Sequence, residues 1–357
     1  MTAMEIELRT LTPLWTGGVD QVCDRLHETG LIGSLRWWYE ALVRGLGGYA
    51  CDPTDEKTKC KEYDPKKGTS SICAACYLFG TTGWARLFRL RVIDKSLDRV
   101  PLHFYTTLSA NKRWLGSIFG GERRNNRVDG ITVPHGKLRL EIIGRGQDEE
   151  YALNQLAWAV EFAARHGGIG AKLQHGFGQV ALETNLHDKA AKGEQAINQR
   201  HAEFYQPREK REDLPSRTRF FVHSFRVSPS HPLFRSILDA KNLIGIPPKN
   251  ATYIPCVFDL RYKGEQIDGK QLGFRQWLLN KRWSKTQINA LLGETQARRD
   301  EERSASRLCV GMPWLDNQGK YSIKFFGFAP PLLATDQVSS EIRAYVQYLF
   351  KSDAGGN

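Results

Sequence analysis

Residues 166–180 read HGGIGAKLQHGFGQV, which places five glycines within one short stretch. Glycine has no Cβ atom, so it adopts positive φ values easily and lets another backbone approach closely. A run this dense in glycine predicts either a loop shaped for contact with a partner or a tight structural corner. The residues of this glycine-rich loop are Gly167, Gly168, Gly170, Gly176 and Gly178, with Lys172 and His175 between them.

The segments around this loop predict a sheet flanked by helices. Apolar residues at helical spacing precede the loop, and a strand-like alternation follows it. In chain order, the first half is expected to contain strand 5–10, helix 31–44, strands 85–92 and 136–142, helix 151–165 and strand 179–183. This order fits a ferredoxin-like sheet with two helices packed on one face.

The length of 357 residues predicts two domains. The expected parts are an N-terminal ferredoxin-like domain over 1–185 with a cysteine-rich insertion at about 50–77, a charged connector over 186–219, a second domain over 220–351 and a disordered tail over 352–357.

A possible internal echo bears on the second domain. Residues 272–279, LGFRQWLL, resemble residues 32–39, IGSLRWWY, because in both a glycine is followed closely by arginine and tryptophan. A chance match over so few residues is the alternative. If the echo is real, the second half repeats the first, and the fold class is α+β with tandem ferredoxin-like (RRM-like) domains.

The charge of the chain favours a polyanionic partner. Lys and Arg number 51 against 39 Asp and Glu, which gives a net charge of +12 and a pI near 9.4. A basic surplus attracts nucleic acid through counterion release, although many basic proteins bind none. No apolar run is long enough to cross a bilayer, and charged residues among the first ten argue against a secretory signal, so we expect a cytoplasmic protein.

Two expected strands carry basic residues on one face. In the strand 85–92, Arg89 and Arg91 alternate with apolar residues, and residues 136–142 repeat the arrangement. A sheet with one buried and one basic face can serve as a platform for single-stranded RNA, and an ordinary solvated face is the alternative. With the helix 31–44 and the loops included, the candidate RNA contacts are Arg36, Arg44, Arg86, Arg89, Arg91, Lys112, Arg113, Arg123, Arg124, Lys172 and His175.

Four of these candidates lie in a long basic loop over residues 108–130. Loops of this length inside a compact domain are usually functional or disordered. We expect its basic side chains to follow an RNA backbone, with Trp114 available either to stack on a base or to pack.

Four of the seven cysteines form a possible metal site. Cys51, Cys60, Cys73 and Cys76 follow the pattern Cys-x8-Cys-x12-Cys-x2-Cys, and a Cys-x2-Cys pair can present two thiolates to one tetrahedral ion. We predict structural zinc, which would stabilise an insertion poor in large apolar residues. Unligated reduced thiols are the alternative.

Several segments together resemble the RAMP superfamily of CRISPR effectors, most closely the first-numbered subunits of the type III-B Cmr complex. They are residues 11–18 (LTPLWTGG), 32–38 (IGSLRWW), 78–84 (LFGTTGW) and the glycine-rich loop. The combination is specific and covers most of the first half, whereas the second half matches weakly. The resemblance implies tandem ferredoxin-like domains in a ribonucleoprotein filament, with guide or target RNA and other RAMP subunits as partners. It also implies that the glycine-rich loop guides an RNA backbone.

Three functions compete at this point. The first is a non-catalytic RNA-binding subunit of a Cmr effector complex in antiviral defence, since relatives of this type are not regarded as the slicing subunit. The second is a metal-independent endoribonuclease that processes precursor guide RNA, with His27, His166 and His175 as candidate acid or base groups. The third is a structural cap that binds only proteins.

Overall fold

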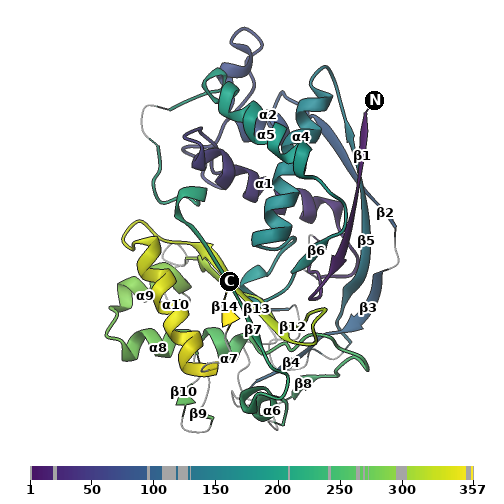
Figure 1. Ribbon diagram of the computed structural model, residues 1–357. Coiled ribbons are helices and arrows are strands. Elements are labelled where there is room, and N and C mark those ends of the chain that lie inside the picture. The colour runs from purple at the N-terminus through teal and green to yellow at the C-terminus, as the bar shows by residue number, and fades with distance from the viewer. Residues whose placement is uncertain are drawn as a thin grey trace.

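Figure 1 shows the computed structural model of the protein. The structure describes residues 2–18, 22–94, 97–106, 118–119, 128, 130–207, 210–239, 243–262, 266–267, 270–271, 273–294, 304–350 and 355–356. Within these residues, no helix combines the length and the apolar character that crossing a membrane requires.

The first sheet has the strand order of a ferredoxin-like fold. Its antiparallel strands run β2 (Phe88–Asp94), β5 (Thr132–Gly144), β1 (Ala3–Thr10) and β6 (Val180–Leu182), and β3 (Leu97–Pro101) pairs with the first part of β5. Alternation decides which face is buried: Ile6 and Leu8 point into the core, whereas Glu5 and Glu7 are exposed.

Helices cover the buried face of this sheet. They are α1 (Glu28–Gly45), α2 (Ala74–Phe79), α4 (Glu149–His166) and α5 (His187–Arg200). The predicted apolar stripe of α1, which includes Leu31, Leu35 and Leu42, is fully buried. Helix α5 opens the predicted connector, yet it packs along α4, where the Gln155 Nε2 donates to the Gly193 carbonyl at 2.8 Å. The connection between the two sheets is therefore the part of the chain after α5.

The second sheet repeats the topology of the first. Its order is β11 (Leu308–Val310), β13 (Tyr321–Phe328), β7 (Phe220–Val227) and β14 (Gly355–Gly356), with β12 (Trp314–Leu315) paired to β13. Helices α8 (Phe274–Asn280) and α9 (Lys285–Leu292) lie between β7 and β11 in the chain, and α10 (Thr335–Phe350) lies between β13 and β14. Tandem ferredoxin-like folds are thus confirmed. The tail, expected to be disordered, contributes Gly355 and Gly356 as the edge strand.

Shorter elements fill the connections. A small sheet pairs β4 (His103–Tyr105) with β8 (Leu243–Gly245) and so links the two halves of the chain. The remaining elements are the helices α6 (Pro232–Leu238) and α7 (Val257–Arg261), the strands β9 (Gln266–Ile267) and β10 (Lys270–Gln271), and the 3-10 turns Gly68–Ser71, Leu173–His175, His201–Glu203 and Arg217–Arg219.

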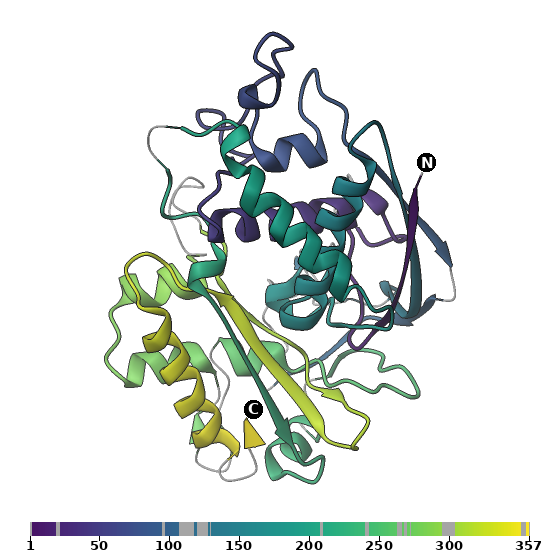
Figure 2. The ribbon, with the colours of Figure 1, turned by 45° about the horizontal axis from the view of Figure 1, so that its top comes forward.

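The first domain's helices lie between the two sheets, as Figures 1 and 2 show for α1 and α4. One face of the second sheet packs on its own helices, where Phe325 contacts Phe274 and Tyr345. Its other face packs on the first domain, where Phe220 contacts Phe162 of α4. The layers therefore alternate as sheet, helices, sheet, helices, and the second sheet has no open face at this end.

Trp38 of α1 is at the centre of this contact. Its fully buried ring lies against Phe220, Phe326 and Phe328 of the second sheet, with ring centroids 5.9 to 6.2 Å away. Its Nε1 donates to the carbonyl of Gly168 at 2.8 Å. One side chain thus joins both domains and the glycine-rich loop.

We predict that Trp38→Phe lowers the free energy of unfolding by about 2 kcal/mol or more, because the buried Gly168 carbonyl loses its donor and a void remains. Urea denaturation measures this loss. Trp277→Phe is the control, since the Trp277 indole bonds to Glu341 in a half-buried position. Equal losses in the two variants would contradict the role assigned to Trp38.

Candidate functional site

The glycine-rich loop is a buried corner at the junction of the domains. Gly167, Gly168, Gly170, Gly176 and Gly178 are all buried. The Ile169 amide donates to the Gly178 carbonyl at 2.8 Å and the Ala171 amide to the Trp15 carbonyl at 2.7 Å, so the loop folds on itself and on the segment after β1. The sequence predicts either a loop for contact with a partner or a tight structural corner in this stretch. The contacts observed are those of a tight corner.

The side chains of Lys172 and His175 in the loop also point inward. The Lys172 Nζ donates to the Ile118 carbonyl at 2.5 Å and lies 4.9 Å from the centre of the Trp15 ring. His175 is 6% exposed and stacks on Phe258 at 5.4 Å, and burial holds its pKa well below the ordinary value, so the ring is neutral. The structure therefore places His175 where its side chain cannot reach a ligand on the surface.

The outer face of the first sheet carries the predicted arginines, but it is not uniformly basic. Arg89 and Arg91 are exposed on β2, as the alternation predicts, and Arg86 packs over the Phe88 ring. The register sets acids beside the bases, and the resulting ion pairs are Arg91–Glu141 at 3.6 Å, Arg139–Glu5 at 3.7 Å and Arg9–Glu183 at 3.0 Å. The outward positions of β1, β2 and β5, all of which the structure describes, hold no aromatic ring on which a base could stack.

The side chains of Arg36 and Arg44 bond to other groups of the protein and are not free at the surface. Arg36 bonds to Glu40 at 2.9 Å and to the Cys76 Sγ at 3.2 Å. Arg44, whose side chain is 10% exposed, donates to the carbonyls of Ala50, Cys51 and Pro215 at 3.0 to 3.1 Å. Burial raises the pKa of the Glu40 carboxyl to about 7, and the charges of Arg44 and Arg36 oppose that shift.

The four predicted cysteines come together in one cluster. All four Sγ atoms lie within 4.8 Å of one another, with Cys51 3.5 Å from Cys76 and 3.7 Å from Cys73. These separations are too long for a disulfide and close to the spacing of about 3.8 Å that four ligands at about 2.3 Å from one tetrahedral ion require. Backbone amides of Cys51, Cys73 and Cys76 point at neighbouring sulfurs at 3.3 to 3.5 Å, as expected around thiolates. The cluster could hold a metal ion.

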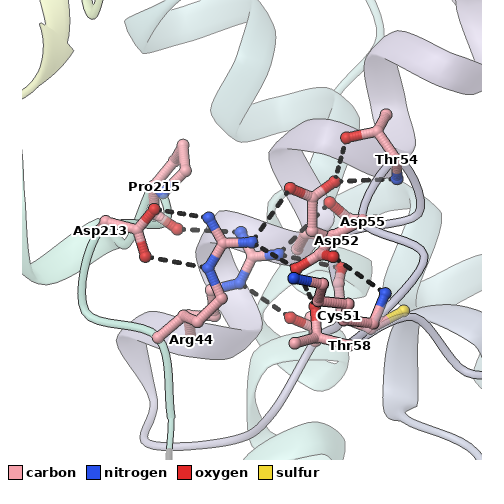
Figure 3. A network of polar contacts seen from close by, with 12 residues as sticks. Arg44, Cys51, Asp52, Thr54, Asp55, Thr58, Asp213 and Pro215 are labelled. Carbon is pink, nitrogen blue, oxygen red and sulfur yellow. Dashed lines mark hydrogen bonds and ion pairs between the residues drawn. The ribbon is translucent and has the colours of Figure 1, made fainter. Parts of the chain in front are cut away.

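A polar network joins the cysteine-rich insertion to the chain after α5 (Figure 3). Arg211 forms ion pairs with Asp55 at 2.8 Å, with Asp213 at 2.6 Å and with Asp52 at 3.7 Å. Arg44 of α1 adds a second link, because it donates both to the Pro215 carbonyl and to the carbonyls of Ala50 and Cys51. The path of residues 210–219, which we call the crossing segment, is therefore fixed against the insertion.

A cleft of about 460 Å³ opens beside the glycine-rich loop, between the two domains. The cleft is lined by residues of α1, the glycine-rich loop, the crossing segment and the start of β11. Trp37, Leu214 and Arg307 are among them. Trp37 is 36% exposed, and its ring packs in a T-shaped arrangement with the Phe328 ring, with the centroids 5.3 Å apart. Trp37 is not among the predicted contacts, because the helical pattern alone does not show that its side chain lines a cleft between the domains.

The candidate catalytic histidines do not share contacts. His27 bonds to Asp24 through Nε2 at 2.6 Å, His166 lies against Phe162 and Phe220, and His175 lies against Phe258. Burial lowers the pKa of His166, with nearby basic groups acting in the same direction. Of the three, His27 is the one that has a carboxylate partner and a partly accessible ring.

Four of the predicted RNA contacts lie outside the described residues: Lys112, Arg113, Arg123 and Arg124. They remain predictions.

Gly176→Ala should destabilise the protein by about 2 kcal/mol, because φ is +87° and a Cβ would lie 2.5 Å from a Val257 methyl and 2.8 Å from the Met312 amide. Gly33→Ala in α1 is the control, since its Cβ would meet no atom within 4 Å. That change should be neutral or slightly stabilising. Thermal unfolding measures both, and a tolerated Gly176→Ala would show that the corner is not tightly packed.

Residues 7–181 match the model of the RAMP superfamily, and no curated protein matches the chain. Among solved structures, Cmr1 from Pyrococcus furiosus in its apo form is 14% identical, with a TM-score of 0.42 over 92% of this chain and 88% of that chain.

Two chains of type III-B Cmr-beta also match, both from cryo-EM structures bound to cognate target RNA. One, with AMPPnP and ssDNA present, is 14% identical with a TM-score of 0.47 over 96% of this chain and 98% of that chain. The other is 13% identical with a TM-score of 0.43 over 97% and 99%. The family match runs from within β1 to within β6, and through this N-terminal domain the chain belongs to the RAMP superfamily.

Proposed function

We propose that the protein is a non-catalytic subunit of a Cmr-type effector complex and binds single-stranded RNA in the cleft between its two domains. The observation that carries the proposal is the exposed Trp37 ring in that cleft, with the Arg307 guanidinium in the same lining. RAMP membership, the sequence segments that resemble Cmr subunits and the net charge of +12 support it.

The chemistry of the cleft suits unpaired RNA. An accessible tryptophan can stack on any base, and an arginine can bind a phosphate or stack in turn. The outer sheet face offers neither an aromatic ring nor a basic surface free of acids. The cleft is therefore favoured over the sheet face, which the alternation of Arg89 and Arg91 first suggested.

Trp37→Ala and Arg307→Gln should each weaken the binding of a single-stranded RNA oligomer by about 10-fold, which is the value of one lost stacking or charged contact. Fluorescence anisotropy with the full chain measures the dissociation constant. Trp37→Phe should keep most of the affinity, because it retains a ring. Arg89→Gln is the matched control for charge and should have little effect.

Two results would contradict the proposal. If Arg89→Gln loses RNA binding and Arg307→Gln binds normally, the RNA binds to the sheet face and not in the cleft. No RNA binding by the wild-type chain would favour a structural cap. The RNA recovered after incubation in EDTA should be intact, and cleavage that His27→Ala abolishes would establish an endoribonuclease instead.

We further propose that the ion held by Cys51, Cys60, Cys73 and Cys76 is zinc. Four sulfur ligands at tetrahedral spacing suit zinc, and they leave no open position for catalysis. Arg36, which donates to the Cys76 sulfur, would offset part of the negative charge of a four-thiolate site. The role of the ion would be to hold the shape of the insertion.

Purified wild-type protein should contain about one zinc per chain, and Cys73→Ser should contain far less and unfold at a lower temperature. Elemental analysis and thermal unfolding measure the two effects. Cys23→Ser is the control, because Cys23 is buried outside the cluster. If the wild-type protein is equally stable without metal, the zinc proposal is wrong and the four thiols are unligated.

A further inference from the structure

A second cleft continues from the first along the crossing segment. It measures about 280 Å³ and lies between residues 44–50, at the C-terminal end of α1, and residues 210–219. Leu214 lines both clefts, so the two are neighbours on either side of this one residue. No residue of the first sheet's outer face belongs to either lining.

The linings of the two clefts are basic. Among the described residues they contain six basic and two acidic side chains: Arg44, Lys172, Lys210, Arg211, Arg219 and Arg307 against Glu212 and Asp213. One of the two acids is already neutralised, since Asp213 accepts two hydrogen bonds from Arg211, at 3.0 and 2.6 Å. Basic charge therefore remains at the point where the two clefts meet.

Four of these basic groups have no carboxylate partner among the described residues, and one of them, Lys172, bonds to the Ile118 carbonyl. Lys210 bonds to the Gly47 carbonyl, Arg307 bonds to the Asp213 carbonyl, and Arg219 makes no ion pair in this part of the chain. Burial lowers the pKa of the Arg307 guanidinium, and the neighbouring charge of Arg219 lowers it further against the opposing effect of Asp213. Like charges held this close are stabilised when an anion lies between them.

The crossing segment is also held in place without a ligand. Arg44 and Arg211 tie it to the cysteine-rich insertion through Pro215, Asp52 and Asp55. The backbone of the crossing segment is therefore in place before an anion arrives, which lowers the entropy lost on binding.

We propose that a second RNA-contact site lies along the crossing segment, where Lys210 and Arg219 bind phosphates of the strand whose base stacks on Trp37. This site rests on the proposed function and extends it: the RNA passes from the interdomain cleft over Leu214 toward the insertion. Ser216 and Thr218 in the same lining offer hydroxyl donors for the phosphate oxygens.

The test measures the affinity of the full chain for single-stranded oligouridylate across a salt series. Each phosphate contact to a single strand contributes about 0.7 to the slope of log K against log salt. The double variant Lys210→Gln/Arg219→Gln should therefore show a slope shallower by about 1.4 and an affinity at low salt reduced by roughly 10-fold. Lys192→Gln, an exposed lysine of α5, is the matched control and should leave both quantities unchanged.

The outcomes separate this site from the proposed function. If Trp37→Ala weakens binding but the double variant keeps the wild-type slope and affinity, the crossing-segment site is wrong and the interdomain cleft stands. If the double variant and Lys192→Gln lose affinity equally, the effect is that of net charge, and the site is again wrong. If the wild-type chain binds no RNA, both proposals fail. Thermal unfolding of the double variant checks that its fold is intact.

Discussion

The packing of Trp38 of α1 against the second sheet constrains the rest of the structure. A ring fully buried between α1 and β13 fixes the two ferredoxin-like folds in layers, with the first domain's helices in the middle. The second sheet's face is then covered where Phe326 and Phe328 meet α1, so it cannot serve there as an open platform. The first sheet keeps an open face, but three of its arginines, Arg9, Arg91 and Arg139, pair with acids. The cleft that contains Trp37 is accessible at the junction of the domains.

The glycines are explained by this same junction. A Cβ at Gly167 would collide with the Trp38 ring, and one at Gly176 would collide with Val257 and Met312 of the second domain. Close approach of backbone to side chain, which only glycine permits, is what the loop provides. A loop that shapes an interdomain cleft can influence RNA binding without touching RNA, because it determines where α1 and β11 lie.

Much of the fold could be predicted from the sequence, because the buried and exposed positions alternate with clear periods. The order of strands and helices in the first half, the repeat in the second half and the clustering of four cysteines are present in the structure. The site was harder to predict. The sequence alone does not distinguish a buried arginine from one on the surface. Only the fold shows that Arg36 bonds to a cysteine sulfur and that Arg44 bonds to backbone carbonyls. Trp37 and Arg307 are far apart in the chain, and no local pattern joins them.

We propose that RNA lies in the cleft between the domains and not on the sheet. Photo-crosslinking of the full chain to a single-stranded RNA that contains 4-thiouridine, followed by mass spectrometry of the peptides, distinguishes the two positions. We expect crosslinks in the peptides that contain Trp37 and residues 304–309. Crosslinks concentrated on the outward positions of β1, β2 and β5, with none at Trp37, would contradict it.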